Sequence, residues 1–338
     1  MKRIVSILAV VFFPVFAQAQ LFTSPRATAL GGYTSVSDDV FGLDWNLAGT
    51  TFHRDNLEVS FGADDYRYNR EFENFRVLMH FKGRHVVAIR RTPGQFLDHA
   101  LFKTPSLPLD SRSPLDLFHE LSYQEDWSVG YAAQLFSNIA FGLDFRRMIY
   151  SNTFHSSSRF WSANLNVFYR VNPKLNLAMV ARNIASYHYK KNIKSIKDYS
   201  KNPPETIPVN FDEFQSVYTK PTFRLDFGAA YHPWSRLLLS LDLYTDGGYG
   251  VGYEWEALKN LFVRQGMSHK YDLLFKNEKV FGLSWGLGYK YHNLRLDATY
   301  YFPYGGRDAV LETTSFGKFS VDPRKTDKVM ISALFSID

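Results

Sequence analysis

The amino-acid sequence predicts an all-β protein: a transmembrane antiparallel β-barrel of about fourteen strands whose N-terminal segment plugs the lumen. Three observations support this fold. Apolar and polar residues alternate over runs of about ten or more residues, which is long enough for a tilted strand to cross a bilayer. Aromatic residues make up 17% of the chain, and cysteine is absent. Short turns alternate along the chain with connections that are mostly longer.

Residues 1–19 have the pattern of a signal peptide. A cationic start at residues 1–3 precedes the apolar run of residues 4–16, and Ala17 and Ala19 supply the small residues that signal peptidase reads. We expect cleavage before Gln20 and export to the outer membrane of a Gram-negative bacterium. The apolar run is too short to be a membrane-spanning helix.

The residue types exclude several classes of function. Without cysteine there is no disulfide and no thiolate chemistry. The net charge of +6 is mild, and export makes nucleic acid a poor partner, so we expect the excess cations in loops and at a rim facing anionic lipid. No histidine pair has metal-ligand spacing and no Ser, His and Asp arrangement supports a nucleophile. We therefore expect no enzymatic activity, no cofactor and no metal site.

The predicted strands alternate with a period of two residues. In residues 138–150, one face carries Ile139, Phe141, Leu143 and Phe145, and the other carries Ala140, Gly142, Asp144 and Arg146. An apolar face toward lipid and a polar face toward the lumen are expected of a membrane barrel. The strands are predicted to begin near Leu57, Phe72, Arg84, Tyr123, Asn138, Arg159, Leu175, Thr222, Leu237, Gly248, Asn260, Lys279, Asn293 and Thr326.

Every second connection between these strands is a tight turn. The turns fall near residues 82–83, 137–138, 172–174, 232–235, 258–259 and 292–293. The longest of the other connections are residues 93–122, 188–221 and 303–325, and residues 245–248 are a short exception. Short turns on one side and long loops on the other place the turns, and both chain ends, in the periplasm.

Charged residues cluster on the inward faces of neighbouring predicted strands. They are Arg224, Asp226, Asp242, Glu254, Arg264, Arg295 and Asp297. One interpretation is a structural network that neutralises charge and pins a plug. The other is an element that sets the selectivity or gating of the lumen.

The predicted outer loop of residues 93–122 is unusually apolar. It includes Phe96, Leu97, Leu101, Phe102, Leu115 and Phe118. These side chains pack on the loop itself and its neighbours, or they form a site for a hydrophobic ligand or a protein partner.

Residues 24–62 resemble the N-terminal segment of FadL-like outer-membrane proteins. The matching residues are Arg26, Leu30, Gly31, Gly32, Asp38, Asp39, Trp45, Asn46, Ala48 and Gly49. Leu47 departs from the pattern, because the family usually has proline there, and leucine does not fix φ. The superfamily includes long-chain fatty-acid transporters and the PorV/PorQ group linked to type IX secretion.

The resemblance implies a hatch over residues 20–55 and a barrel over residues 56–338. It implies uptake of small hydrophobic compounds through a hatch-gated lumen, with outer-membrane lipid and a hydrophobic small molecule as partners. The alternative is a PorV/PorQ-like component that binds secretion-system or secreted proteins. The segment is short enough to fold inside the barrel, so we expect Asp38 and Asp39 to pair with inward arginines such as Arg264 and Arg295.

Overall fold

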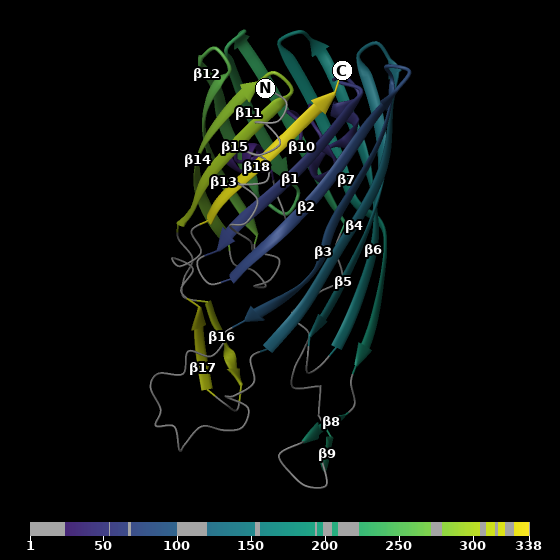
Figure 1. The fold of residues 1–338 in the computed structure, drawn as a ribbon, viewed down its shortest axis with the longest axis vertical. Coiled ribbons are helices and arrows are strands. Elements are labelled where there is room, and N and C mark those ends of the chain that lie inside the picture. Colours follow the sequence, from purple (N-terminus) through teal and green to yellow (C-terminus); the bar gives the residue numbers. More distant parts are fainter. Residues whose placement is uncertain are drawn as a thin grey trace, which may run out of the picture.

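The chain forms a closed antiparallel barrel (Figure 1). The computed structural model describes residues 24–53, 55–66, 69–99, 120–152, 156–192, 195–198, 205–208, 223–271, 279–304, 309–314, 317–321 and 328–337. Fourteen of the described strands form the barrel, each hydrogen-bonded to the strands before and after it in the barrel sequence. The barrel closes where β1 pairs with β18, from Leu57 opposite Ile337 to Tyr66 opposite Lys328. The predicted antiparallel β-barrel and its number of strands are confirmed.

The barrel strands begin close to their predicted starts. They are β1 (Leu57–Tyr66), β2 (Asn69–Phe81), β3 (His85–His99), β4 (Glu120–Phe136), β5 (Ile139–Asn152), β6 (Ser156–Asn172), β7 (Leu175–Asn192), β10 (Arg224–Trp234), β11 (Leu237–Tyr244), β12 (Tyr249–Leu258), β13 (Leu261–Tyr271), β14 (Lys279–Tyr291), β15 (Leu294–Tyr304) and β18 (Lys328–Ile337). The largest shifts are in β2, β4 and β6, which begin three residues early (69 against 72, 120 against 123, 156 against 159).

Two hairpins lie outside the barrel sheet. They are β8 (Ser195–Asp198) with β9 (Glu205–Pro208), and β16 (Ala309–Thr314) with β17 (Gly317–Val321). In Figure 1 they lie at the opposite end of the barrel from the C-terminus. Both fall within connections that the sequence predicts only as long loops.

The tight turns lie at the end of the barrel that carries the C-terminus. At the β2–β3 turn, Lys82 and Gly83 have φ of 52° and 65°. Two successive positive φ values match the twist of a tight hairpin, and glycine tolerates them without strain. At the opposite end, the β1–β2 and β5–β6 connections are also short, since β1 ends at Tyr66 and β2 begins at Asn69, and β5 ends at Asn152 and β6 begins at Ser156.

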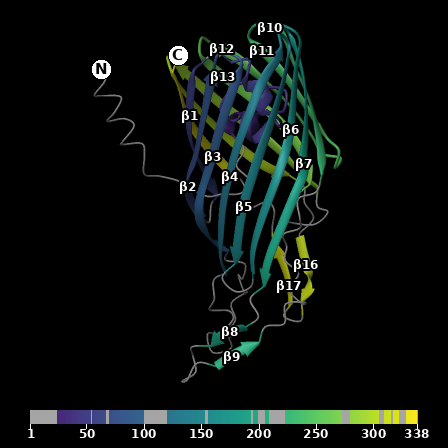
Figure 2. The ribbon, with the colours of Figure 1, turned by 90° about the vertical axis from the view of Figure 1, so that its right-hand side faces the viewer.

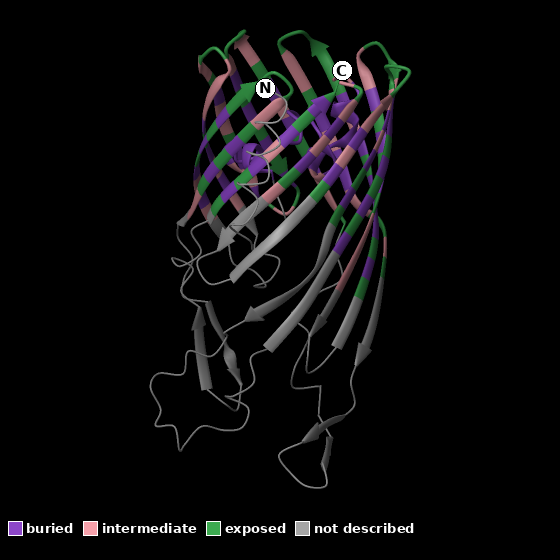
Figure 3. Cartoon of the chain, in the orientation of Figure 1, coloured by how far each residue is buried: buried purple, intermediate pink, exposed green. Residues whose placement is uncertain are grey.

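The strand faces divide as the alternation predicts (Figure 3). In β11, Leu239, Leu241 and Leu243 are exposed outward, whereas Ser240 and Asp242 are buried in the lumen. The outward apolar side chains suit contact with lipid. The inward polar ones are buried because further protein fills this part of the lumen.

Residues 24–53 lie inside the barrel (Figure 2). They contain three short helices, α2 (Pro25–Ala29), α3 (Gly42–Trp45) and α4 (Leu47–Thr50). None of the described helices is long and apolar enough to cross a membrane. The main apolar core joins this segment to the wall: Leu30, Tyr33, Val40, Phe41, Leu43, Trp45 and Leu47 pack with Leu78, Val86, Ala132, Leu238 and Leu334.

A bulge in β7 changes the register with β6. Ala163 pairs with Ala185, but Leu165 pairs with Ala181. Asn183 within the bulge has φ of 56°, and its backbone N–H donates to Asn164 Oδ1 at 2.8 Å. Bulges redirect nearby side chains, and Arg182, beside Asn183, points to the segment inside the lumen.

The predicted outer loop of residues 93–122 is shorter than expected. Phe96 and Leu97 belong to β3, where they pair with Tyr123 and Ser122 of β4. The ladder continues past the register shift between Thr92 and Gln95, so these two residues are not loop residues. Leu101, Phe102, Leu115 and Phe118 lie outside the described residues.

A charge placed on the lipid-facing surface tests the orientation of the strands. Leu241 lies in the middle of β11 and is 41% exposed. Leu241→Arg should destabilise the barrel by about 2–4 kcal/mol, because the cation would lie in hydrocarbon. Leu258→Arg, at the β12–β13 turn, should cost about 0–1 kcal/mol. Urea unfolding in lipid vesicles measures both, and equal costs would contradict the assigned orientation.

Candidate functional site: a segment held inside the barrel

Residues 24–53, the lumen segment, begin with a capped helix. The Ser24 hydroxyl oxygen accepts a hydrogen bond from the backbone N–H of Ala27 at 2.9 Å, and Pro25 occupies the first helical position. Serine at the cap followed by proline is a favoured way to start a helix. This start positions Arg26 on α2, the cation around which one half of the site is built.

The two glycines after α2 allow the segment to touch the barrel wall. Gly31 has φ of 71°, and a Cβ there would lie 2.3 Å from the Met267 carbonyl oxygen. A Cβ on Gly32 would lie 2.6 Å from Asp242 Oδ2. Both positions therefore require glycine, the first for conformation and contact and the second for contact.

Asp242 on β11 binds the backbone that follows these glycines. Its Oδ2 accepts hydrogen bonds from the N–H groups of Tyr33 and Thr34 at 2.8 and 2.9 Å, and from the Thr34 hydroxyl at 2.8 Å. This fully buried carboxylate satisfies donors that have no helix or strand partner. The predicted lumen charge Asp242 therefore holds the segment directly.

Asn46 and Leu47 dock the last helix on β6. Asn46 caps α4 through the Ala48 N–H at 3.1 Å, and its side-chain amide donates to the Val167 carbonyl at 3.0 Å. The Leu47 N–H donates to Asn166 Oδ1 at 3.2 Å. Proline, which the resemblance leads one to expect at this position, has no N–H for this bond. Leucine therefore supports the helix start with a contact that proline lacks.

Arg26 is the centre of a buried ion cluster. Its Nε and Nη2 donate to the two carboxylate oxygens of Glu254 on β12, at 2.9 and 2.8 Å. Its Nη1 donates to Asp38 at 2.5 Å and to the Tyr33 hydroxyl at 2.8 Å. A two-pronged arginine–carboxylate pair fixes orientation as well as position. The Arg26 guanidinium is therefore one of the groups that bind the lumen segment to the wall.

Two further arginines extend this cluster along the wall. Arg264 donates to Glu254 at 2.5 Å and to Asp297 at 2.7 Å. Arg295 forms an ion pair with Asp297 at 2.9 Å and lies 3.7 Å from Asp39. Arg264 therefore pairs with residues of the barrel wall and not with the lumen segment. The main partner of Asp38 is Arg26, a pair that the sequence analysis did not propose.

The cluster contains four carboxylates and three guanidinium groups. The carboxylates belong to Asp38, Asp39, Glu254 and Asp297, and the guanidinium groups to Arg26, Arg264 and Arg295. Burial, and then the neighbouring charge of Asp38, raise the pKa of Asp39. Protonation of Asp39 would balance the charge of the cluster.

A second ion cluster holds the other end of the segment. Asp44 on α3 pairs with Arg76 of β2 at 2.7 Å and with Arg90 of β3. Arg90 continues to Asp126 of β4 at 2.6 Å, and Asp126 pairs with Arg146 of β5 at 2.5 Å. The sequence analysis named none of these five residues as a site, although Asp126 and the arginines fall on the inward faces of their strands.

Arg182 forms a third contact between wall and segment. Its guanidinium donates to the carbonyl oxygens of Asp44 and Trp45, both at 3.2 Å, and pairs with Asp226. Arg224 also pairs with Asp226, at 2.6 Å. The predicted charges Arg224 and Asp226 therefore act through Arg182, which satisfies carbonyls at the end of α3.

Inward glycines form a groove on β12, β13 and β14 that receives α2 and the residues after it. A Cβ on Gly250 would lie 2.0 Å from the Gly31 carbonyl oxygen, and on Gly266 2.4 Å from that of Ala29. Around the groove, Thr299 and Ser284 donate to the carbonyls of Pro25 and Ala29 at 2.7 and 3.3 Å. The wall and the segment therefore meet backbone to backbone.

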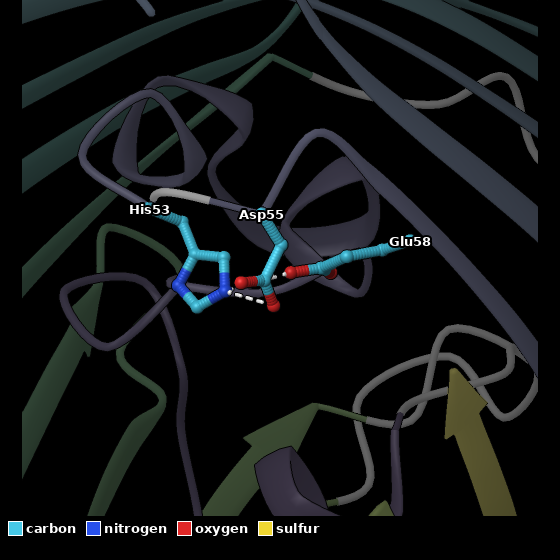
Figure 4. Close-up of side chains that lie close together, drawn as sticks. All are labelled: His53, Asp55 and Glu58. Atoms are coloured by element: carbon cyan, nitrogen blue, oxygen red, sulfur yellow. Dashed lines mark hydrogen bonds and ion pairs between the residues drawn. The ribbon is translucent and has the colours of Figure 1, made fainter. Parts of the chain in front are cut away.

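A titratable group lies where the lumen segment joins β1 (Figure 4). His53 Nε2 is 2.9 Å from Asp55 Oδ2 and 3.0 Å from Glu58 Oε1. Burial would lower the pKa of His53, but hydrogen bonds and charge from Glu58 and Asp55 outweigh it and raise the pKa to about 9. The sequence analysis missed this group, because its spacing matches no familiar metal motif.

The predicted hatch residues all lie in or beside these contacts. Arg26, Asp38 and Asp39 share the first cluster, and Gly31 and Gly32 touch the wall. Trp45 and Ala48 are buried, and a Cβ on Gly49 would lie 2.3 Å from the Ser37 carbonyl oxygen. Of the predicted apolar loop residues, Leu101, Phe102, Leu115 and Phe118 lie outside the described residues.

Solved structures share this architecture. Matches are the Ralstonia pickettii toluene transporter TbuX (11% identity, 96% of this chain and 100% of that one, TM-score 0.60), the Pseudomonas putida toluene transporter TodX (12%, 95% and 99%, 0.59) and a Pseudomonas aeruginosa FadL homologue (10%, 96% and 100%, 0.56). The fold is that of the FadL-like barrels. No protein-family model and no curated protein sequence matches the chain.

The glycine groove of this FadL-like barrel gives a matched pair of substitutions. Gly266→Ala places a Cβ 2.4–2.5 Å from backbone atoms of Ala29, Leu30 and Gly31, so it should displace the segment. Gly62→Ala in β1 meets atoms no closer than 3.8 Å and should leave the segment in place. We expect Gly266→Ala alone to raise ion conductance in planar bilayers. Equal conductance of both variants and the unmodified protein would show that the groove does not hold the segment.

Removing the Arg26 guanidinium, the central cation of the first ion cluster, should also loosen the lumen segment from the barrel wall. Arg26→Gln removes the two-pronged partner of Glu254, which keeps Arg264, and the guanidinium partner of Asp38, whose side chain is 57% exposed. The cost should therefore lie below the about 3–5 kcal/mol of breaking an isolated buried pair. Chymotrypsin should then cleave at Tyr33, Phe41 and Trp45, whereas the exposed-turn control Arg236→Gln should stay protected.

Adding Glu254→Gln to Arg26→Gln should restore part of the protection, since it removes one carboxylate from a cluster that the first substitution leaves with four carboxylates and two guanidinium groups. Cleavage of the single Arg26 variant at the rate of the unmodified protein would contradict the role of the pair.

Proposed function

We propose that this protein takes up small hydrophobic compounds across the outer membrane through a lumen gated by its N-terminal segment. The observation that supports this most directly is the mode of attachment of the lumen segment. It fills the lumen, yet it is held to the wall by ion pairs and hydrogen bonds centred on Arg26, Asp44 and Asp242. Such contacts can be exchanged for water when a segment moves, which makes them suitable for a hatch.

The chain connectivity also suits a hatch. The segment leads into β1 at Leu57, so that end is anchored to the wall. If residues 1–19 are removed as a signal peptide, the hatch of residues 20–55 has a free amino end, and residues 56–338 form the barrel. Displacement of the segment would then need no rearrangement of the strands.

The proposed substrate class rests on two features. TbuX and TodX, which share the fold, are toluene transporters. In this chain, residues 100–119, the remainder of the predicted apolar loop of residues 93–122, connect β3 to β4 at the end of the barrel away from the tight turns. We propose that Leu101, Phe102, Leu115 and Phe118, with Phe96 and Leu97 at the tip of β3, first receive the hydrophobic compound.

The secretion-component alternative has no specific support. Among the described residues, we find no feature that would bind a secreted protein and that a transporter would lack. The matched barrels named above are transporters or a FadL homologue. We therefore keep PorV/PorQ-like protein binding as an outcome of the test below.

Uptake by whole cells tests the proposal. Cells that lack their own hydrophobic-compound transporter should accumulate labelled toluene or long-chain fatty acid faster when they express this protein. Gly266→Ala should also admit a hydrophilic dye, because its lumen stays open, whereas Gly62→Ala should behave as the unmodified protein.

An unchanged rate of uptake by cells that carry correctly folded barrel in the outer membrane would overturn the transport proposal. Co-purification of secretion components under the same conditions would then favour the alternative.

A further inference from the structure

The group formed by His53, Asp55 and Glu58 has the chemistry of a metal site. One donor atom from each residue lies within 4.8 Å of the other two. One imidazole nitrogen and two carboxylate oxygens are a ligand set that zinc accepts. All three project toward one point at the start of β1 (Figure 4).

The carboxylates are positioned by further hydrogen bonds. Glu58 Oε2 accepts the Val40 N–H at 2.6 Å, which leaves Oε1 facing His53. The Ser336 hydroxyl hydrogen-bonds to Asp55. Supporting bonds of this kind orient ligands in metal sites and reduce the cost of organising them.

We propose that His53, Asp55 and Glu58 bind one Zn²⁺ ion where the lumen segment joins the barrel. This inference is independent of the proposed transport function. The ion would link His53 of the lumen segment to Glu58 of β1, on either side of Asp55, at the point where the segment is anchored.

The distances suit the ion after a small expansion. Ligand atoms of a tetrahedral zinc site lie about 3.3 Å apart. The two nitrogen–oxygen distances of 2.9 and 3.0 Å would each have to lengthen by a few tenths of an ångström. His53 is about one-third exposed, so its side chain can adjust and water can fill the fourth position.

The surrounding charges also favour a cation. Asp38 acts on His53 and Asp39 acts on Glu58, both as negative neighbours. The opposing charge is Lys290, which acts on Asp55. The His80 ring lies 6.4 Å from that of His53, and its Nε2 bonds to the Thr50 carbonyl. Asp38 and Asp39 are themselves paired with Arg26 and Arg295, so among the described residues the negative charge next to a bound ion would come mainly from Asp55 and Glu58.

Zinc titration of the full mature protein tests the proposal. The protein is prepared in detergent without a polyhistidine tag, stripped with chelator, and titrated with Zn²⁺ against a competing fluorescent chelator. We expect one ion per chain. His53→Gln and Asp55→Asn should each weaken binding by about 10–100-fold, a range seen even for supporting residues.

The control is His292→Gln, which removes an exposed histidine in the β14–β15 turn and should leave the affinity unchanged. X-ray absorption of the loaded protein should show a shell of nitrogen and oxygen ligands that includes one imidazole. Absence of stoichiometric binding, or equal affinity of the His53 variant and the unmodified protein, would overturn the proposal.

Discussion

The two-pronged pair between Arg26 and Glu254 is the contact on which the arrangement of the lumen depends. Both groups are buried; Arg26 without Glu254 would lose its two-pronged partner, whereas Glu254 without Arg26 would keep Arg264. A buried ion pair of this type adds little net stability over apolar packing, but it accepts only one geometry. It therefore determines where α2 lies, and α2 in turn sets the path of Gly31, Gly32 and the backbone bound by Asp242.

The rest of the lumen follows from the width of the barrel. Fourteen strands enclose more space than wall side chains can fill. Here residues 24–53 occupy part of that space, and they contact the wall in two ways. Small inward residues on β12–β14 let backbone approach backbone, while arginines on β2, β3 and β7 reach across to Asp44 and its neighbours. The segment therefore contacts β12–β14 at positions where the wall has glycine, and it contacts β2, β3 and β7 through arginine side chains.

The barrel itself could be read from the sequence, because alternation over long strands is a local signal. Positions such as Leu241 and Asp242 are assigned to opposite faces by parity alone. The hairpins β8–β9 and β16–β17 were missed, because they are short and lie within long connections. Phe96 and Leu97 were assigned to a loop predicted to begin at residue 93, whereas β3 continues past residues 93 and 94 with a register shift.

The site was only partly predictable for a different reason. Parity identifies inward charges such as Glu254 and Arg264, but it does not say which partner each one meets across the lumen. The pairing of Asp44 with Arg76 and Arg90 depends on how the segment is folded within the barrel, which no strand pattern encodes. The grouping of His53 with Glu58 depends likewise on the angle at which the chain enters β1.

The sequence separation of Arg26 and Glu254 has a consequence for folding. These residues are 228 positions apart, and every described strand from β1 to β11 lies between them in the chain. Contacts between residues this far apart in the sequence form late, because the long stretch of chain between them must be organised first. During biogenesis the wall facing α2 therefore appears after α2 has been made. A newly closed barrel would therefore leak until the lumen segment, residues 24–53, has bound inside it.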